Sequence, residues 1–332
     1  MRRSITGIKP TGIPHLGNFI GAMRPALQLS ETYEAFYFIA DYHALNAITD
    51  PKALKQMTYE VAAAWLSMGL NPNKVTFYRQ SDVPETFQLF SVLANSTAKG
   101  LMNRAHAYKA SVDRNMEQDR NPDDGINMGL FNYPILMAAD ILIFSADVVP
   151  IGHDQLQHLE ITRDIVETFN KTYGNVLTLP KPVISQETSV PGLDGRKMSK
   201  SYDNTIPLLT MSGKKLQKLV RKFKTDSSAA DAPKDADNSS VFKLYKELAI
   251  PEDAASIRLE LMEGKLSWGG MKDLLYETLE KLLEQPRAKY EHLMANPKEI
   301  EQILQEGAHK AKPEAQALVS AVRNAIGVNW AP

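Results

Sequence analysis

Short runs of consecutive apolar residues alternate with longer amphipathic stretches over the first two hundred residues. Ala35–Ala40 is a continuous apolar and aromatic run, as expected of a strand that is buried on both faces of a sheet. Ser4–Ile8 is a short segment rich in residues that favour strands, and Val75–Tyr78 is a third candidate strand. Between Ala35–Ala40 and Val75–Tyr78, apolar positions recur at helical spacing behind Asp50-Pro51, a pair typical of a helix start. Strands that alternate with helices indicate an α/β fold with a parallel sheet.

Helical periodicity dominates the rest of the chain. The further stretches with this spacing are Tyr133–Phe144, His153–Tyr173, Lys214–Lys224, Ser240–Leu248, Asp253–Met262, Met271–Leu283 and Pro297–Ile326. The polar segment 111–127 contains proline and glycine and is predicted to be an exposed loop. No strand is predicted after the glycine-rich loop at 190–204. The sequence therefore predicts a parallel α/β domain over residues 1–206 and an all-helical domain over residues 207–332.

The composition excludes several kinds of chemistry. The chain has 332 residues and no cysteine, which rules out a disulfide scaffold, a cysteine nucleophile and cysteine-ligated metal sites. Its 38 Lys and Arg residues nearly balance its 39 Asp and Glu residues, and the net charge is −1. A polyanionic ligand would therefore have to bind at a local basic patch, because the protein carries no overall positive field.

The beginning of the chain bears on its location. The sequence MRRSITGIKP has two arginines but no apolar run behind them, so it is not typical of a signal peptide. No stretch reaches the roughly 18 uninterrupted apolar residues that a membrane-spanning helix needs. We therefore expect the protein in the cytoplasm.

A glycine-punctuated segment, Gly7 to Asn18, follows the first predicted strand. Glycines allow a ligand to approach the backbone closely, and the free N–H groups of the helix that follows favour an anion. His15 and Asn18 would lie in the first turn, where both can donate hydrogen bonds to a phosphate. The segment matches neither of the two common phosphate-binding motifs. The alternative interpretation is a tight strand-to-helix turn with a capping asparagine.

A second candidate is the segment Lys197 to Ser201, directly after another glycine-containing turn. Two lysines three residues apart on such a loop can bring positive charge onto a polyphosphate. The hydroxyls of Ser199 and Ser201 can add hydrogen bonds. The alternative is an ordinary exposed basic loop.

A third candidate lies on the helix predicted from Tyr133. Tyr133, Met137 and Asp140 share one face, at spacings of four and three residues. A carboxylate in so apolar a helix is costly unless it is paired. Asp140 must therefore meet an arginine or lysine of the core, or be available to a donor on a ligand.

Residues at the start of the next helix are candidates for a metal site. His153, Asp154 and His158 are possible ligands, but their spacing matches no metal-binding motif and no further strong ligand is near. The sequence therefore predicts no protein-bound metal ion.

Taken together, these segments resemble the class I aminoacyl-tRNA synthetases. His15-Leu16-Gly17-Asn18 is similar to their HIGH signature, and Lys197 to Ser201 reproduces their KMSKS signature in full. Gly152, Asp154 and Gln155 resemble a third family element. The stretch from Tyr133 to Asp140 resembles the tryptophan-specific branch. The four elements occur in the family's order, and the resemblance covers essentially the whole chain.

The resemblance implies an amino-acid pocket that suits tryptophan. Indole N–H is a donor only, so its site needs one buried acceptor in an apolar envelope. Asp140 would supply the acceptor and Met137 a polarisable sulfur surface. The tyrosine-specific branch would have glutamine in place of Met137. His43 would close the other side, unless it is simply a core histidine at a strand end. The implied tryptophan-binding residues are Gly7, His43, Tyr133, Met137, Asp140 and Gln155.

The resemblance also implies a nucleotide site and a set of catalytic groups. The implied ATP-binding residues are Lys9, Pro10, Thr11, Gly17, Asn18, Gly152, His153, Asp154, Val190, Lys197, Met198, Ser199, Lys200 and Ser201. The implied catalytic residues are His15, Asn18, Lys197 and Lys200. Lys9 stands where glutamine is common in the family, Thr11 replaces a serine, and His153 stands where an acidic residue is common. These departures bear on details of ATP contact.

The implied reaction has two steps and no tightly bound cofactor. Tryptophan reacts with ATP, carried as its Mg²⁺ complex, to give tryptophanyl-adenylate and pyrophosphate, and the tryptophanyl group then passes to the 3′ end of tRNA(Trp). The fold implied is a Rossmann-like parallel-sheet nucleotide-binding domain followed by an all-helical anticodon-binding domain. The resemblance also implies a homodimer.

Three alternatives stay open at this point. The chain could be a tyrosine-specific synthetase, a nucleotidyl ligase of the same fold that activates a carboxylate without tRNA, or a binding paralogue without catalysis. One predicted helix is strongly basic and is either a tRNA-backbone patch or the solvated side of an amphipathic helix. Its basic residues are Lys214, Lys215, Lys218, Arg221, Lys222 and Lys224.

Overall fold

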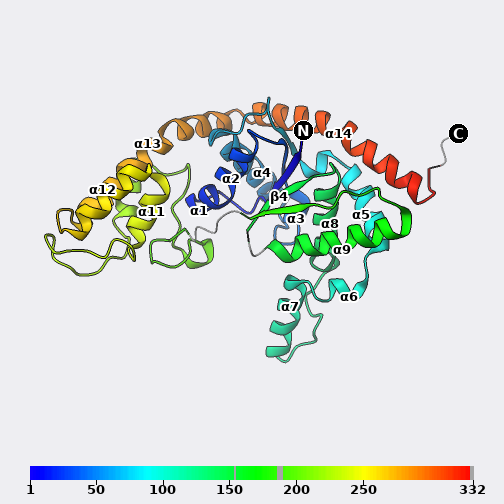
Figure 1. The fold of residues 1–332 in the computed structure, drawn as a ribbon, viewed down its shortest axis with the longest axis horizontal. Helices are drawn as coiled ribbons and strands as arrows, with labels where there is room; N and C mark the ends of the chain where they lie inside the picture. The colour runs from blue at the N-terminus through cyan, green and yellow to red at the C-terminus, as the bar shows by residue number, and fades with distance from the viewer. Residues whose placement is uncertain (153–154, 185–189, 330–332) are drawn as a thin grey trace.

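Five parallel strands form the central sheet of the computed structural model, which describes residues 1–152, 155–184 and 190–329. The strands are β1 (Arg3–Ile8), β2 (Glu34–Ile39), β3 (Thr76–Arg79), β4 (Val148–Ile151) and β5 (Lys181–Ile184). Their order across the sheet is β3-β2-β1-β4-β5 (Figure 1). The three predicted strands are confirmed to within one or two residues. β4 and β5 were not predicted, because each contains a proline, a residue that disfavours a strand in a sequence-based prediction.

Helices connect the strands and cover both faces of the sheet. They are α1 (Leu16–Asn18), η1 (Phe19–Met23), α2 (Arg24–Leu29), α3 (Asp41–Ala44), α4 (Pro51–Ser67), η2 (Gln80–Asp82), α5 (Glu85–Ser96), α6 (Lys99–Met102), α7 (His106–Glu117), α8 (Met128–Leu142) and α9 (Leu156–Tyr173). The predicted start of α4 is confirmed, since the Asp50 side chain accepts a hydrogen bond from the backbone N–H of Lys52. Helix α8 begins before its predicted start, with the Asn127 side chain capping its first turn.

The prediction of a loop over residues 111–127 is wrong for its first part. Residues 111–117 form the end of helix α7, which projects from the body of the protein as an arm (Figure 1). An exposed helix of this kind buries no apolar stripe, so its sequence lacks the periodic signal. The Asn115 side chain donates to the carbonyl oxygens of Pro122 and Asp124 and holds the turn that follows.

The C-terminal part is helical, as predicted. After a short turn of helix, η4 (Lys200–Tyr202), come α10 (Gly213–Val220), α11 (Ser240–Leu248), α12 (Pro251–Met262), α13 (Trp268–Ala295) and α14 (Pro297–Ala325). All five predicted helices are present, and α13 continues through Pro286 beyond its predicted end. Within the described parts of the chain, no helix is long and apolar enough to cross a membrane.

Two hydrophobic clusters lie on opposite faces of the sheet. Along β2, Tyr37 and Ile39 point into one cluster, whereas Phe36 and Phe38 point into the other. This alternation buries both faces, which explains the uninterrupted apolar run in the sequence. The first cluster also contains side chains from α10, α11 and α13, so the packing continues from the sheet into the helical lobe.

The last helix returns to the sheet. Helix α13 leads from the helical lobe to the α/β part, and α14 continues across the top of that part in Figure 1 and lies against the edge strand β3. At Gly307 the two backbones approach so closely that a Cβ atom would overlap the carbonyl oxygen of Phe77. This contact covers one edge of the sheet. The domain boundary after residue 206 stays a prediction. Helix α14 belongs to the second predicted domain but packs on the sheet of the first.

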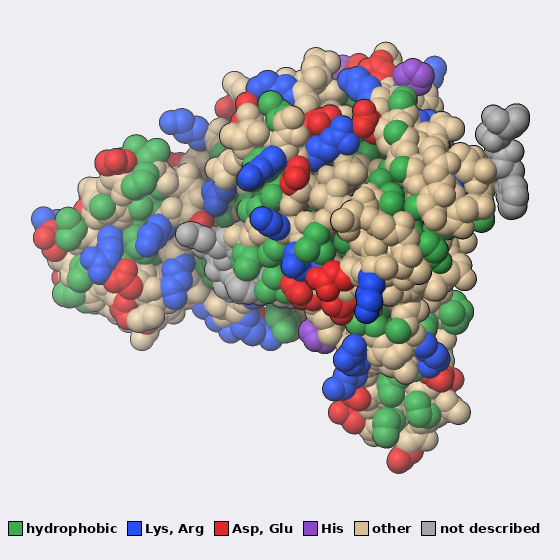
Figure 2. Space-filling model, turned by 45° about the vertical axis from the view of Figure 1, so that its right-hand side comes forward, with side chains coloured by type: hydrophobic (Ala, Val, Ile, Leu, Met, Phe, Trp, Pro, Cys, Tyr) green, Lys and Arg blue, Asp and Glu red, His purple; other side chains and the backbone are tan. Residues whose placement is uncertain are grey.

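The surface carries charge of both signs. Figure 2 shows the helical lobe and the α7 arm projecting from a central body, with basic and acidic side chains interspersed over the visible face. This distribution agrees with the net charge of −1.

Candidate active site

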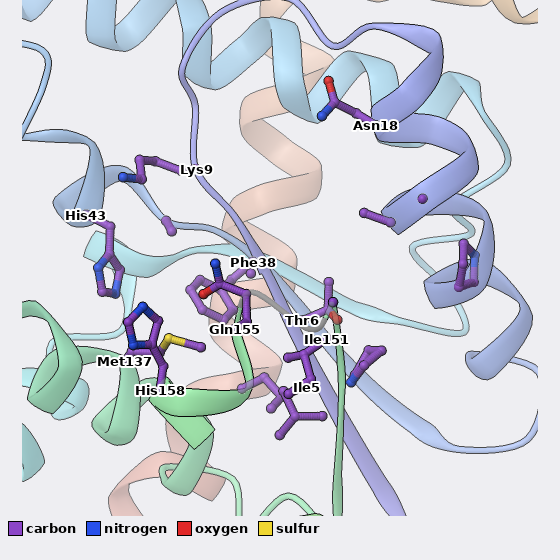
Figure 3. A pocket seen from close by; sticks show the side chains of 18 of the residues that line it. Ile5, Thr6, Lys9, Asn18, Phe38, His43, Met137, Ile151, Gln155 and His158 are labelled. Atoms are coloured by element: carbon purple, nitrogen blue, oxygen red, sulfur yellow. The ribbon is translucent and has the colours of Figure 1, made fainter. Parts of the chain in front are cut away.

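A cavity of about 750 Å³ opens at the carboxyl ends of the central strands. Gly7 from β1, Phe38 from β2 and Ile151 from β4 line it. The order of strands reverses direction between β1 and β4, and ligands of open parallel sheets bind at such a point. The cavity has two ends, which different elements build (Figure 3).

One end is mainly apolar and aromatic. Met137 from α8, His43 from α3 and Gln155 gather there around the ring of Phe38 (Figure 3). The ring of Phe38 lies so close to Gly7 that a Cβ atom at that position would overlap it. A flat aromatic ligand fits such an end, with backbone on one side and a thioether on another.

Asp140 lies directly behind this end and is only 3% exposed. Its Oδ2 is 2.8 Å from Nε2 of His43, and Nε2 of Gln80 donates to Oδ1 and Oδ2 at 2.8 and 2.9 Å. Burial raises the pKa of Asp140, and the hydrogen bonds from His43 and Gln80 oppose that rise. Of the two alternatives stated for Asp140, the core arginine or lysine partner is wrong. A histidine and a glutamine hold the carboxylate instead.

Tyr133 also faces this end and is bound to His158. The phenol oxygen lies 2.6 Å from Nε2 of His158, and the two rings are perpendicular. Burial raises the pKa of Tyr133 to about 12, so the phenol keeps its proton at neutral pH. His158, a possible metal ligand by its sequence position, is part of the wall of the cavity.

The other end is built on the first helix. His15 precedes α1, and its backbone N–H donates to Oδ1 of Asn18 at 3.0 Å, which is the capping arrangement named as the alternative. Burial, with the nearby charge of Lys200, lowers the pKa of His15 to about 4. His15 is therefore neutral at pH 7, and its Nδ1 has no hydrogen-bond partner within the described part of the chain. A neutral imidazole can donate one hydrogen bond to a phosphate oxygen.

The second signature lies against the first. The Lys200 ammonium donates to the carbonyl oxygen of Thr11 at 3.1 Å, and Sδ of Met198 accepts from the backbone N–H of Gly17 at 3.3 Å. Burial lowers the pKa of Lys200. The hydroxyls of Ser199 and Ser201 are 2.9 Å apart. Segments almost two hundred residues apart in sequence are thus brought into contact.

The structure brings most of the predicted site residues to the cavity. Those that line it are Gly7, Lys9, His15, Gly17, Asn18, His43, Tyr133, Met137, Gly152, Gln155, Val190, Lys197, Met198 and Ser199. The predicted residues that are not among its lining are Pro10, Thr11, Asp140, Lys200 and Ser201. His153 and Asp154 lie outside the described residues.

Several residues of the site were not predicted from the sequence. Thr6, Phe38 and Ile151 line the cavity, and Gln80 holds Asp140. The signal that could have found them is their place at or just after the carboxyl end of a parallel strand. Over residues 1–152, 155–184 and 190–329, no group of three His, Asp or Glu side chains is arranged to hold a metal ion.

Comparisons with known proteins agree with this geometry. The family described as tRNA synthetases class I (W and Y) matches residues 2–284. The chain is 51% identical to the tryptophan–tRNA ligase of Bordetella parapertussis over 330 residues, which are 98% of this chain and 73% of that protein. It is 48% identical to the tryptophan–tRNA ligase of Neisseria meningitidis, with 98% of each chain covered.

A solved structure extends the likeness to three dimensions. The tryptophanyl-tRNA synthetase of Campylobacter jejuni, complexed with ADP and tryptophan, has a TM-score of 0.88 and 38% identity, with 98% of this chain and 99% of that chain covered. Tyrosyl-tRNA synthetase of Aeropyrum pernix, at 16% identity and a TM-score of 0.65, shares the fold. The chain therefore belongs to the tryptophan and tyrosine group of class I tRNA synthetases.

Proposed function

We propose that this chain is a tryptophan–tRNA ligase. One observation carries the proposal: a single cavity has both class signatures at one end and a buried carboxylate behind an aromatic-lined wall at the other. The relatives named above as tryptophan–tRNA ligases support the choice of amino acid.

The first step joins tryptophan to AMP. A carboxylate oxygen of tryptophan forms a bond to the α-phosphorus of ATP, and the bond from that phosphorus to the bridging oxygen breaks, so that pyrophosphate leaves with the electron pair. The carboxylate is ionised at pH 7, so the step needs positioning and charge stabilisation rather than a general base. Lys197 and Lys200 neutralise the departing pyrophosphate, and neutral His15 donates a hydrogen bond to a phosphate oxygen.

Mg²⁺ enters with ATP in this proposal. It partly neutralises the phosphate oxygens, and Asn18 and the backbone N–H of Gly17 complete their hydrogen bonding. For Gly17 to do so, its N–H must exchange the sulfur of Met198 for a phosphate oxygen. Lys9 lines the same end of the cavity and adds a cation there.

In this proposal, the enzyme selects tryptophan over other amino acids by its indole N–H. A carboxylate has about four acceptor positions, and His43 and Gln80 take up to three of those on Asp140. The remaining position accepts from indole. The site then rejects analogues that lack this donor, because a buried acceptor would be left unpaired. Met137, Tyr133, Gly7 and Gln155 enclose the rest of the amino acid.

The second step and the assembly complete the proposal. A ribose hydroxyl at the 3′ end of tRNA(Trp) attacks the acyl carbon of the adenylate and releases AMP. We assign residues 207–332 to anticodon binding, and we propose a homodimer that works in the cytoplasm, where ATP and tRNA are available. A tyrosine-specific enzyme is disfavoured, because Met137 offers the phenol hydroxyl no hydrogen-bonding group of useful strength.

The test is ATP–pyrophosphate exchange with each of the twenty amino acids, followed by charging of tRNA(Trp). We expect exchange with tryptophan alone and transfer to tRNA. Exchange with tyrosine would support the sister activity. Exchange without charging would support a nucleotidyl ligase, and no exchange with any amino acid would support a binding paralogue.

A further inference from the structure

Helix α14 is bound to the carboxyl end of β3 through a two-pronged ion pair. Arg79 is the last residue of β3, and its Nη1 and Nη2 donate to Oε2 and Oε1 of Glu301 at 3.1 and 3.0 Å. Nη2 also donates to Oδ1 of Asp82 at 3.0 Å. Two parallel N–H···O bonds fix the orientation of both side chains as well as their distance.

This pair is partly buried and has further partners. The side chains of Arg79 and Glu301 are 20% and 27% exposed. The Tyr59 hydroxyl donates to Oε2 of Glu301 at 3.0 Å, and Nε2 of Gln305 donates to Oε1 at 2.8 Å. These bonds, and above all that from Arg79, lower the pKa of Glu301 and keep it ionised at neutral pH. The arrangement is therefore more fixed than an ordinary surface ion pair.

The two residues after Arg79 are hydrogen-bonded to side chains at the apolar and aromatic end of the cavity, which we call the amino-acid end. Gln80 is 1% exposed, donates to Asp140, and accepts from the backbone N–H of Tyr42 at 3.2 Å. The N–H and hydroxyl of Ser81 donate to Asp41 at 3.1 and 2.5 Å. Asp41 and Tyr42 belong to α3, the helix that carries His43. Hydrogen bonds and the backbone of residues 79–81 thus connect α14 to Asp140 and to the helix of His43.

A second ion pair on α14 provides an internal comparison. Glu314 accepts from Nη2 of Arg3 at 2.9 Å, and Arg3 is the first residue of β1. Both glutamates join α14 to the sheet through an arginine. Glu301 does so at the carboxyl end of a strand, next to the cavity, whereas Glu314 does so at the amino end of a strand, where no ligand is expected.

We propose that Glu301 is a positioning residue for the tryptophan pocket. By orienting Arg79 it sets the backbone of residues 79–81, so that Gln80 aligns Asp140 and Ser81 aligns the helix of His43. Glu301 itself touches no substrate. The inference rests on the proposed function, because it assigns these side chains to tryptophan recognition.

Glu301→Gln and its matched control Glu314→Gln test the proposal in the exchange assay. We expect Glu301→Gln to raise the tryptophan KM about threefold to tenfold and to weaken the preference over tyrosine, because coupling through such networks is of this size. The ATP KM should stay within about twofold, since the nucleotide end has no part in the network. Glu314→Gln should leave all three quantities unchanged.

A second variant guards against a merely structural effect. Arg79→Lys keeps the positive charge but loses the paired N–H donors of the guanidinium. It should therefore raise the tryptophan KM as Glu301→Gln does. This second variant keeps the test decisive if Glu301→Gln lowers the yield of folded protein. Thermal unfolding of each variant shows whether the two glutamine variants are destabilised alike. An unchanged tryptophan KM in Glu301→Gln and Arg79→Lys, or an equal change in Glu314→Gln, would overturn the proposal. Absence of tryptophan-dependent exchange in the unmodified protein would instead refute the proposed function.

Discussion

The two ends of the cavity are built in opposite ways. At the amino-acid end, Asp140 and Gln80 are buried and hydrogen-bonded to each other, and His43 completes the group. At the nucleotide end, Lys200 begins the short helical turn η4, and its ammonium donates to the carbonyl oxygen of Thr11. Nearby in the chain, Met198 accepts a hydrogen bond from the N–H of Gly17 in α1. The groups of the first end are bonded to one another, whereas those of the second are bonded to backbone groups that the proposed phosphate contacts would replace.

This difference matches the two tasks of the proposed reaction. Selection of one amino acid requires donors and acceptors whose positions are fixed, because an imperfect ligand then leaves a buried group unpaired. Activation requires positive charge at the place where negative charge develops on the departing pyrophosphate. A loop can bring that positive charge there. The comparison therefore predicts changes in rate from the nucleotide end and changes in selectivity from the amino-acid end.

The largest expected effect is on the rate, at Lys200. Lys200→Ala removes a cation from the departing pyrophosphate, so we expect kcat of the exchange reaction to fall about 10²- to 10³-fold. The tryptophan KM should stay nearly unchanged, because Lys200 is at the other end of the cavity. A large rise in that KM with kcat intact would contradict the charge-stabilising role and the separation of the two ends.

A smaller but selective effect is expected at Asp140. In Asp140→Asn an amide N–H replaces an acceptor that faces Gln80, His43 and the indole. We expect kcat/KM for tryptophan to fall about 10- to 100-fold, the size of one hydrogen bond to a charged group. The ATP KM and the midpoint of thermal unfolding serve as controls. Activity equal to that of the unmodified protein would remove Asp140 from the recognition site.

The wall opposite Asp140 offers a further way to sharpen the comparison. Met137→Gln introduces the residue that the tyrosine-specific branch would carry at this position. We expect the ratio of kcat/KM for tryptophan over tyrosine to fall about tenfold, because the amide disfavours indole and suits a phenol hydroxyl. Parallel exchange assays with both amino acids measure the ratio. If the ratio did not change, Met137 would be packing without a part in selection.

The smallest expected effect concerns stability at mildly acidic pH. The pKa of His15 is lowered from its ordinary 6.5 to about 4 in the folded protein. Between these values the unfolded chain binds a proton that the folded protein does not, so stability falls as the pH drops from about 6.5 towards 4. His15→Gln should lose this dependence, and its midpoint of thermal unfolding should drop by about 2–4 °C less between pH 7 and pH 5. Carboxylates titrate alike in both proteins, so an identical drop would contradict the lowered pKa.

Local sequence patterns predicted the strongly periodic elements of the fold. Helix α11 has the predicted bounds, and β1 differs by a single residue, because continuous or periodic apolar positions report which side of an element is buried. The strands β4 and β5 each contain a proline, which disfavours a strand prediction, and β5 is at the edge of the sheet and only partly buried. Helix α7 buries little, and its polar sequence therefore resembled a loop.

The candidate site was predicted where its residues form contiguous signatures. His15–Asn18, Lys197–Ser201 and Met137 all came from local motifs, and most of these residues line the cavity. Gln80 could have been proposed from its place two residues after a predicted strand. No local signal distinguishes Glu301 from the other acidic residues on the exposed side of its helix.

The sequence by itself determined the α/β character of the first part and the helices of the second, the absence of cysteine chemistry, the two signatures and the presence of a carboxylate in an apolar helix. Only the tertiary structure decided what that carboxylate contacts, because its partners His43 and Gln80 are 97 and 60 residues away. It also decided that Glu301 binds Arg79, across 222 residues. Periodicity shows which face of an element is buried but not which element covers it. That choice depends on how all the faces pack together.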